Sequence, residues 1–256
     1  MLVETITNKN NFSFNFVGNT NVQKANVELP FSEHVEELRQ RTIHTLSVLI
    51  LVSILAFCDI KPIVELLQIP VVNIKFFQLA PGEYFLETVK IAFYSGLTIT
   101  SPILLSQFTF FIIPGLTANE KRLLLPLLIG SIILFFISLA FSYFCLIPAA
   151  LQFFISYSSD VIEPLWSFSQ YCDFILVLFS TTAIAFQIPI FQIILGVLEI
   201  ISGTSMLNLW KYVVLIAVIV GAVLTPSTDP ITQLLLSSAI LILYFLGAGI
   251  LILLKR

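Results

Sequence analysis

Six apolar blocks follow one another along this chain, and they restrict its possible folds more than any other feature. They lie at about residues 42–59, 88–113, 123–147, 171–195, 209–224 and 231–254. A helix needs about 20 apolar residues to cross the hydrocarbon core of a bilayer. The mean hydropathy is +1.02 and only 11% of the residues are charged, so a soluble domain would not hide this much apolar surface. The sequence therefore predicts an all-α polytopic membrane protein with six transmembrane helices.

Prolines and block lengths predict the shape of this bundle. Four prolines fall inside or at the edges of the blocks: Pro102, Pro126, Pro148 and Pro189. Each removes a backbone donor and bends its helix, which favours a curved, cup-shaped bundle. The fifth block is too short to cross a full bilayer, so we expect it to lie where the bilayer is thinned or where other helices shield its ends. Residues 1–30 are polar and are expected to form a mobile leader, and residues 31–256 form the membrane domain.

Basic residues predict the orientation of the spans. If both termini lie on one side, that side receives nine basic residues, namely Lys9, Lys24, Arg39, Arg41, Lys121, Arg122, Lys211, Lys255 and Arg256. The far side then receives three, Lys61, Lys75 and Lys90. Because basic loops stay on the cytoplasmic side, both termini should be cytoplasmic or on the organellar equivalent. The long loops 60–87 and 148–170 lie on the far side, where residues 63–77 are expected to form a short amphipathic surface element.

Several function classes find no support in the sequence. A net charge of −3 argues against a nucleic-acid partner. The scattered Cys58, Cys145 and Cys172 form no redox or metal motif, and we expect no metal and no cofactor. The spans contain almost no ionisable residue and no internal repeat, which disfavours the main alternative, a secondary transporter of a small molecule or ion. A membrane enzyme is less favoured still, since no nucleophile or acid–base pair is evident.

Polar side chains gather instead beside the first and third spans. Glu37 and Arg41 share one helix face at i, i+4 spacing in the charged run that precedes the first span. A second cluster, Asn119-Glu-Lys-Arg122, opens the third span. Both patterns are typical of amphipathic and capped helix starts. The alternative interpretation is that Glu37 and Glu120 together form an anionic site for a cationic ligand at the membrane surface.

Two further polar residues have both a structural and a functional interpretation. Gln187 lies deep in the fourth block, where it can join helices by hydrogen bonds or take part in a site. Asp229 precedes Pro230, and this pair is typical of a helix cap followed by proline at the first helical position. Capping explains Asp229 without excluding a role in gating or assembly.

Taken together, the motifs resemble those of the TatC family, the receptor subunit of the twin-arginine protein translocase. The resemblance begins at Glu37-Leu-Arg-Gln-Arg41 before the first span and extends over about residues 28–254. Its other motifs are Ser101-Pro102, Ile113-Pro-Gly-Leu-Thr-Ala-Asn-Glu-Lys-Arg122, Phe141-Ser-Tyr-Phe with Pro148, Phe186-Gln-Ile-Pro189 and Leu224-Thr-Pro-Ser-Thr-Asp229. Each motif alone is weak, but their order and their sides of the membrane make the combination specific.

This resemblance implies a receptor that binds twin-arginine signal peptides of folded precursor proteins and is not an enzyme. The family's signal-binding acids correspond to Glu37 and Glu120, and its entry arginine corresponds to Arg39. Gln187 stands where some members carry Glu, so a charged role there is not expected. Implied partners are single-span TatA- and TatB-type proteins and further copies of the chain, with transport driven by the proton-motive force.

The same motifs predict a location. Pro-Gly-Leu-Thr117 and Pro-Ser-Thr-Asp-Pro230 look like those of the cyanobacterial and plastid branch of the family. Heavy use of Asn, Ile and Phe fits an AT-rich coding genome such as that of an organelle. We therefore expect a plastid thylakoid protein with both termini stromal, the alternative being a bacterial cytoplasmic membrane.

Overall fold

The computed structural model describes residues 31–71, 76–112, 121–158, 165–225 and 229–253, and the predicted leader 1–30 lies outside this part. In chain order the elements are α1 (Phe31–Cys58), α2 (Ile60–Gln68), β1 (Phe76–Phe77), α3 (Glu83–Ile112), α4 (Lys121–Phe141), a π-helical turn (Ser142–Leu146), α5 (Ile147–Ser158), β2 (Trp166–Ser167), α6 (Phe168–Ala185), α7 (Ile188–Val197), α8 (Gly203–Asn208), α9 (Trp210–Leu224) and α10 (Pro230–Leu253).

Long apolar helices dominate the described residues, so the predicted fold class is confirmed. Within these residues, five segments are long and apolar enough to span a membrane, namely Val35–Cys58, Glu83–Phe111, Arg122–Tyr157, Phe168–Val197 and Pro230–Leu253. Trp210–Val223 is a shorter apolar helix, as the fifth block predicts. At 1.5 Å per residue, the 15 residues of α9 span only about 22 Å. This is less than a hydrocarbon core of about 30 Å.

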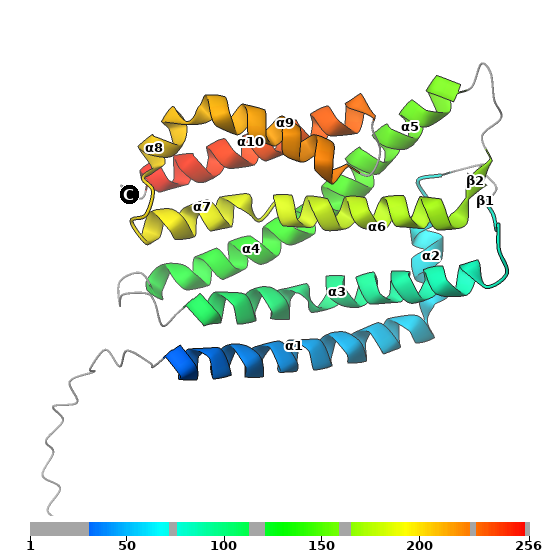
Figure 1. Cartoon of the computed structure of the whole chain (residues 1–256), viewed down its shortest axis with the longest axis horizontal. Helices are drawn as coiled ribbons and strands as arrows, with labels where there is room; N and C mark the ends of the chain where they lie inside the picture. Colours follow the sequence, from blue (N-terminus) through cyan, green and yellow to red (C-terminus); the bar gives the residue numbers. More distant parts are fainter. Residues whose placement is uncertain (1–30, 72–75, 113–120, 159–164, 226–228, 254–256) are drawn as a thin grey trace, which may run out of the picture.

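The helices form a bundle with two distinct ends (Figure 1). The start of α1, the end of α3 and the start of α4 lie at one end, which we name the proximal end. The distal end carries α2, β1, β2 and the start of α6. α1 lies at one edge and packs on α3, while α9 lies at another edge and packs on α10; α4 and α5 run obliquely through the bundle.

The prolines shape the helices as expected at two places. Pro189 follows a break, where α6 ends at Ala185 and α7 begins at Ile188. Pro148 follows the π-helical turn, which contains Phe144, the residue four positions before it. A proline ring clashes with the carbonyl at i−4, and a widened turn relieves this clash while the helix continues.

The helix that contains Pro148 corrects the predicted loop 148–170. Residues Ile147–Ser158 are helical and continue the third span well beyond its predicted end at residue 147.

The amphipathic element at the distal end is confirmed in part: α2 covers Ile60–Gln68, whereas Phe76–Phe77 pairs in parallel with Trp166–Ser167 as a two-stranded sheet. The tyrosine hydroxyls of Tyr143 and Tyr171 donate to the carbonyls of Leu66 and Leu67, at 2.9 and 2.6 Å, and so tie α2 to the bundle.

Most hydroxyl side chains in the spans are satisfied within their own helix. Thr45 donates to the Arg41 carbonyl at 2.8 Å, Thr100 to the Gly96 carbonyl at 2.6 Å and Thr182 to the Leu178 carbonyl at 2.6 Å. Such back-bonding lets serine and threonine lie in an apolar environment without a partner on another helix. The main apolar core lies between α3, α5, α6 and α10 and includes Ile91, Leu146, Ile175, Leu178 and Leu236.

Glycines allow helices to approach closely. A Cβ built on Gly96 of α3 would lie 2.9 Å from the Cα of Ser53 on α1 and would clash with the Ser53 hydroxyl. Gly221 faces Ser237 in the same way between α9 and α10. Small residues at such crossings permit the van der Waals packing that holds helices together in lipid, where no hydrophobic force drives helix association.

We predict that Gly96→Val destabilises the α1–α3 pair by about 1–3 kcal/mol, because the new side chain overpacks a backbone contact. Thermal unfolding of the detergent-purified protein measures this. Gly249→Val is the matched control, since a Cβ at Gly249 of α10 meets nothing within 4 Å. Equal shifts in the midpoints of both variants would show that helix propensity, not the close approach, sets the effect.

Candidate functional site

The first turns of α1 carry two ion pairs that differ in exposure. Arg39 pairs with Glu36 at 2.7 Å, and these side chains are 67% and 46% exposed. Gln40 also donates to the same oxygen of Glu36, at 3.1 Å. This outward pair lies at the proximal end, so the structure places the predicted site residue Arg39 at the surface, where it can contact a ligand or lipid head groups.

The second ion pair lies between helices. Arg41 donates to Oε1 of Glu37 from Nε at 3.0 Å and from Nη2 at 2.6 Å. Its Nη1 donates to Oε1 of Gln107 on α3, at 2.8 Å. The side chains of Arg41 and Glu37 are 28% and 29% exposed, so the pair is half-buried. The Arg41 guanidinium therefore joins the Glu37 carboxylate to Gln107 at the α1–α3 interface.

Gln107 is a residue that sequence reasoning missed. It lies near the end of α3, 66 positions after Arg41, and no local pattern links the two. The only available signal was an amide side chain near the end of an apolar block. The antiparallel packing of α1 on α3 brings it to the Glu37–Arg41 pair (Figure 1).

Glu120 lies outside the described residues, so its distance from Glu37 stays a prediction. The described helices on either side of it are α3, which ends at Ile112, and α4, which begins at Lys121. These two helix ends lie at the proximal end together with the start of α1 (Figure 1).

Gln187 connects two helices near the middle of the bundle. It is 9% exposed and lies at the break between α6 and α7. The Ser131 hydroxyl of α4 donates to its Oε1 at 2.5 Å, and its Nε2 donates to the Ser131 carbonyl at 3.3 Å. These bonds agree with the structural interpretation. Gln187 also lines an apolar cavity of about 340 Å³ between α3, α4, α6 and α7.

Asp229 caps α10, as the Asp-Pro pair predicts. Its Oδ2 accepts from the backbone amide of Thr232 at 2.8 Å and from the Thr232 hydroxyl at 2.5 Å. The side chain is 1% exposed. Because α10 starts toward the distal end, Asp229 is not brought together with Glu37 or Arg39 (Figure 1).

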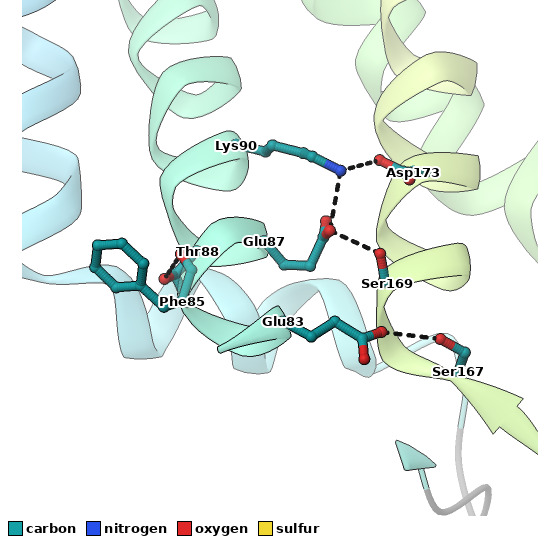
Figure 2. Close-up of polar contacts among 8 residues, drawn as sticks. All are labelled: Glu83, Phe85, Glu87, Thr88, Lys90, Ser167, Ser169 and Asp173. Carbon is teal, nitrogen blue, oxygen red and sulfur yellow. Dashed lines mark hydrogen bonds and ion pairs between the residues drawn. The ribbon is translucent and has the colours of Figure 1, made fainter. Parts of the chain in front are cut away.

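A polar network that the sequence analysis did not predict lies at the distal end (Figure 2). Lys90 of α3 contacts Glu87 at 2.9 Å and Asp173 of α6 at 2.8 Å. Ser169 donates to Glu87 at 2.7 Å. Glu87 is 3% exposed. The sequence analysis did not single it out, because the predicted second span begins one residue later, at residue 88. The network joins α3 to α6.

Glu83 extends this contact by one turn. Its Oε1 accepts from the Ser167 hydroxyl of β2 at 3.2 Å (Figure 2). Its Oε2 accepts from the amides of Leu79 and Ala80 at 2.7 and 3.1 Å. Glu83, Glu87 and Lys90 therefore share one face of α3. The described residues contain no group of three or more His, Cys, Asp or Glu side chains that could hold a metal ion.

Comparison with known proteins agrees with this architecture. The family model described as Sec-independent protein translocase protein (TatC) matches residues 33–238. An uncharacterized tatC-like protein ycf43 from Trieres chinensis is 56% identical over 96% of this chain and 92% of its own length.

Two relatives carry translocase names. The Sec-independent protein translocase protein TatC of Synechocystis is 49% identical over 87% of this chain and 88% of its own length. The chloroplastic protein of that name from Pisum sativum is 48% identical over 86% of this chain and 63% of its own length.

The fold matches as well as the sequence. A crystal structure of the twin-arginine translocase receptor TatC superposes with a TM-score of 0.75 at 33% identity, covering 87% of this chain and 100% of that one. The sequence match, the long apolar helices and the structural match agree over most of the chain. This integral membrane protein belongs to the TatC family of Sec-independent protein translocases.

Proposed function

We propose that this chain is the receptor subunit of a twin-arginine protein translocase. It binds the twin-arginine signal peptides of folded precursor proteins and takes part in their transport across the membrane. The observation that carries the proposal is Glu37, a carboxylate held half-buried at the proximal end of a chain from a protein translocase family. The name of the matching crystal structure, a twin-arginine translocase receptor, supports the same role.

The chemistry of the proposed site is the recognition of guanidinium groups. Arginine stays charged at every physiological pH and donates in a planar fork, which a carboxylate accepts with two parallel bonds. Each charge-assisted hydrogen bond contributes about 1.5–3 kcal/mol. Glu37 and Glu120 are the proposed acceptors for the two arginines. Arg39 is the proposed entry residue, and its exposure permits contact with the precursor.

The apolar part of a signal peptide needs a second surface. Two adjoining apolar cavities lie between α3, α4 and α6, with volumes of about 340 and 490 Å³. They share Tyr94, Thr98, Leu139 and Phe179 in their linings. We propose that the apolar segment lies along this surface while the arginines bind at the proximal end. Gln187 then contributes hydrogen bonds rather than charge.

Membership of a translocase family implies work within a larger complex. We propose single-span TatA- and TatB-type partners, further copies of the chain, and transport driven by the proton-motive force. No polar channel is evident among the described helices, so we propose that partners or a thinned bilayer supply the path. The short α9 supports thinning, because its 15 residues do not span a full hydrocarbon core.

The location follows from the relatives and the charges. The Pisum sativum relative is named as chloroplastic. We propose that this chain lies in a plastid thylakoid membrane with both termini in the stroma. The basic residues support this orientation through their nine-to-three distribution between the two sides.

Replacing either proposed acid tests the site. We predict that Glu37→Ala and Glu120→Ala each weaken crosslinking of twin-arginine precursors by about tenfold or more, because each loses at least one charge-assisted bond. Glu65→Ala is the control, since Glu65 is an exposed acid on α2 at the distal end. Membrane insertion of all three variants should match the parent. Unchanged crosslinking in the Glu37/Glu120 double variant rejects the assignment.

Asp229 separates transport from binding. We predict that Asp229→Ala destabilises the start of α10 by about 0.5–2 kcal/mol, because it leaves the Thr232 amide and hydroxyl without their acceptor. Precursor crosslinking should persist, since Glu37 lies at the other end, while transport should be lost. Asp229→Asn should retain more transport because Asn also caps. Normal transport by the Ala variant would show that Asp229 only caps α10. If Asn and Ala impair transport equally, transport requires the negative charge of Asp229.

A further inference from the structure

Arg41 places a guanidinium on the same carboxylate that the proposed function assigns to the signal peptide. We propose that Arg41 is an internal competitor, which occupies Glu37 in the unliganded receptor and must be displaced when an arginine of the signal binds. This inference rests on the proposed function, since it assumes that Glu37 binds the signal. It concerns the regulation of that site.

The geometry of Arg41 is that of a bound ligand. Two of its nitrogens donate to one oxygen of Glu37, at 3.0 and 2.6 Å, and a third donates to Gln107 at 2.8 Å. An arginine from another chain would present the same planar fork to the same acceptor. Two guanidiniums contacting one carboxylate oxygen in this way would bring like charges together, which favours exchange over sharing.

The neighbouring Arg39 shows why Arg41 is distinct. Arg39 pairs with Glu36, three residues earlier on the same helix, and both side chains extend outward with 67% and 46% exposure. Arg41 is bonded to a second helix through Gln107, and its pair with Glu37 is half-buried. The bond to Gln107 restricts the Arg41 side chain, so less conformational freedom remains to be lost when it pairs with Glu37.

Internal competition has a quantitative signature. The apparent affinity of a ligand falls by the fraction of receptor that is competent to bind it. That fraction depends on the Arg41–Glu37 equilibrium and not on the ligand. Arg41 should therefore weaken the binding of twin-arginine and twin-lysine peptides by the same factor. The result is an affinity threshold that excludes weakly bound basic segments while strong signals still bind.

The experiment measures binding of a fluorescent twin-arginine peptide, and of its twin-lysine counterpart, to the full chain in lipid nanodiscs. Arg41→Gln should tighten binding of both peptides by the same factor, about two- to fivefold for a pair near the surface. Arg41→Lys should tighten both by a smaller factor, because lysine lacks the fork but keeps the charge. A gain with Lys therefore excludes a simple loss of positive charge as the cause.

Two further variants, at Gln107 and Glu37, distinguish failure of the competition from failure of the proposed function. Gln107→Leu frees Arg41 from α3 and should also tighten binding, which keeps a test available if an Arg41 variant does not fold. Weaker or unchanged binding in the folded Arg41 variants, or a gain for only one peptide, overturns internal competition. Glu37→Gln tests the proposed function separately: if it binds as the parent does, Glu37 is not the signal site. If Glu37→Gln loses binding and the Arg41 variants gain none, only the competition is wrong.

Discussion

Lipid is the solvent of this chain, and this constraint explains where its polar groups lie. A polar side chain in a span is costly unless it finds a partner inside the protein or lies at an end of the bundle. Thr45, Thr100 and Thr182 bond to their own helices. Gln187 bonds to Ser131 across a helix contact. The ionisable residues that remain gather at the two ends, in the Glu37–Arg41–Gln107 contact and around Glu87.

The two ends have different consequences for function. At the distal end, Lys90 lies between Glu87 and Asp173 and joins α3 to α6, so these three charges are used within the protein. At the proximal end, Arg39 is exposed and Glu37 is half-buried, so a ligand can approach them. We therefore propose that an arginine-bearing segment binds at the end where α1 starts. This asymmetry is the physical basis of the proposed receptor function.

Hydrophobic patterning predicted the fold well because spans are set by length and composition alone. Each of the six blocks is helical in the structure, and Pro189 marks the break that divides the fourth block into α6 and α7. Patterning failed at Pro148, where the helix continues to Ser158 instead of ending. A π-helical turn accommodates the proline, and such a local rearrangement depends on packing rather than on composition.

The site was predicted only in part, for a similar reason. The i, i+4 spacing of Glu37 and Arg41 is local, so this ion pair could be predicted from the sequence. The capping role of Asp229 is local as well. The contacts of Arg41 with Gln107 and of Lys90 with Asp173 join residues 66 and 83 positions apart. Only the packing of α3 against α1 and α6 brings them together.

Site-specific photocrosslinking tests the central claim most directly. A photoreactive residue replaces either Gln40, exposed on α1 at the proximal end, or Gln170, exposed near the start of α6 at the distal end. The account predicts that a twin-arginine precursor is captured from position 40 and not from position 170, and that a twin-lysine precursor is captured poorly from both. Equal capture of the two precursors from position 40, or preferred capture from position 170, would contradict guanidinium recognition at the start of α1.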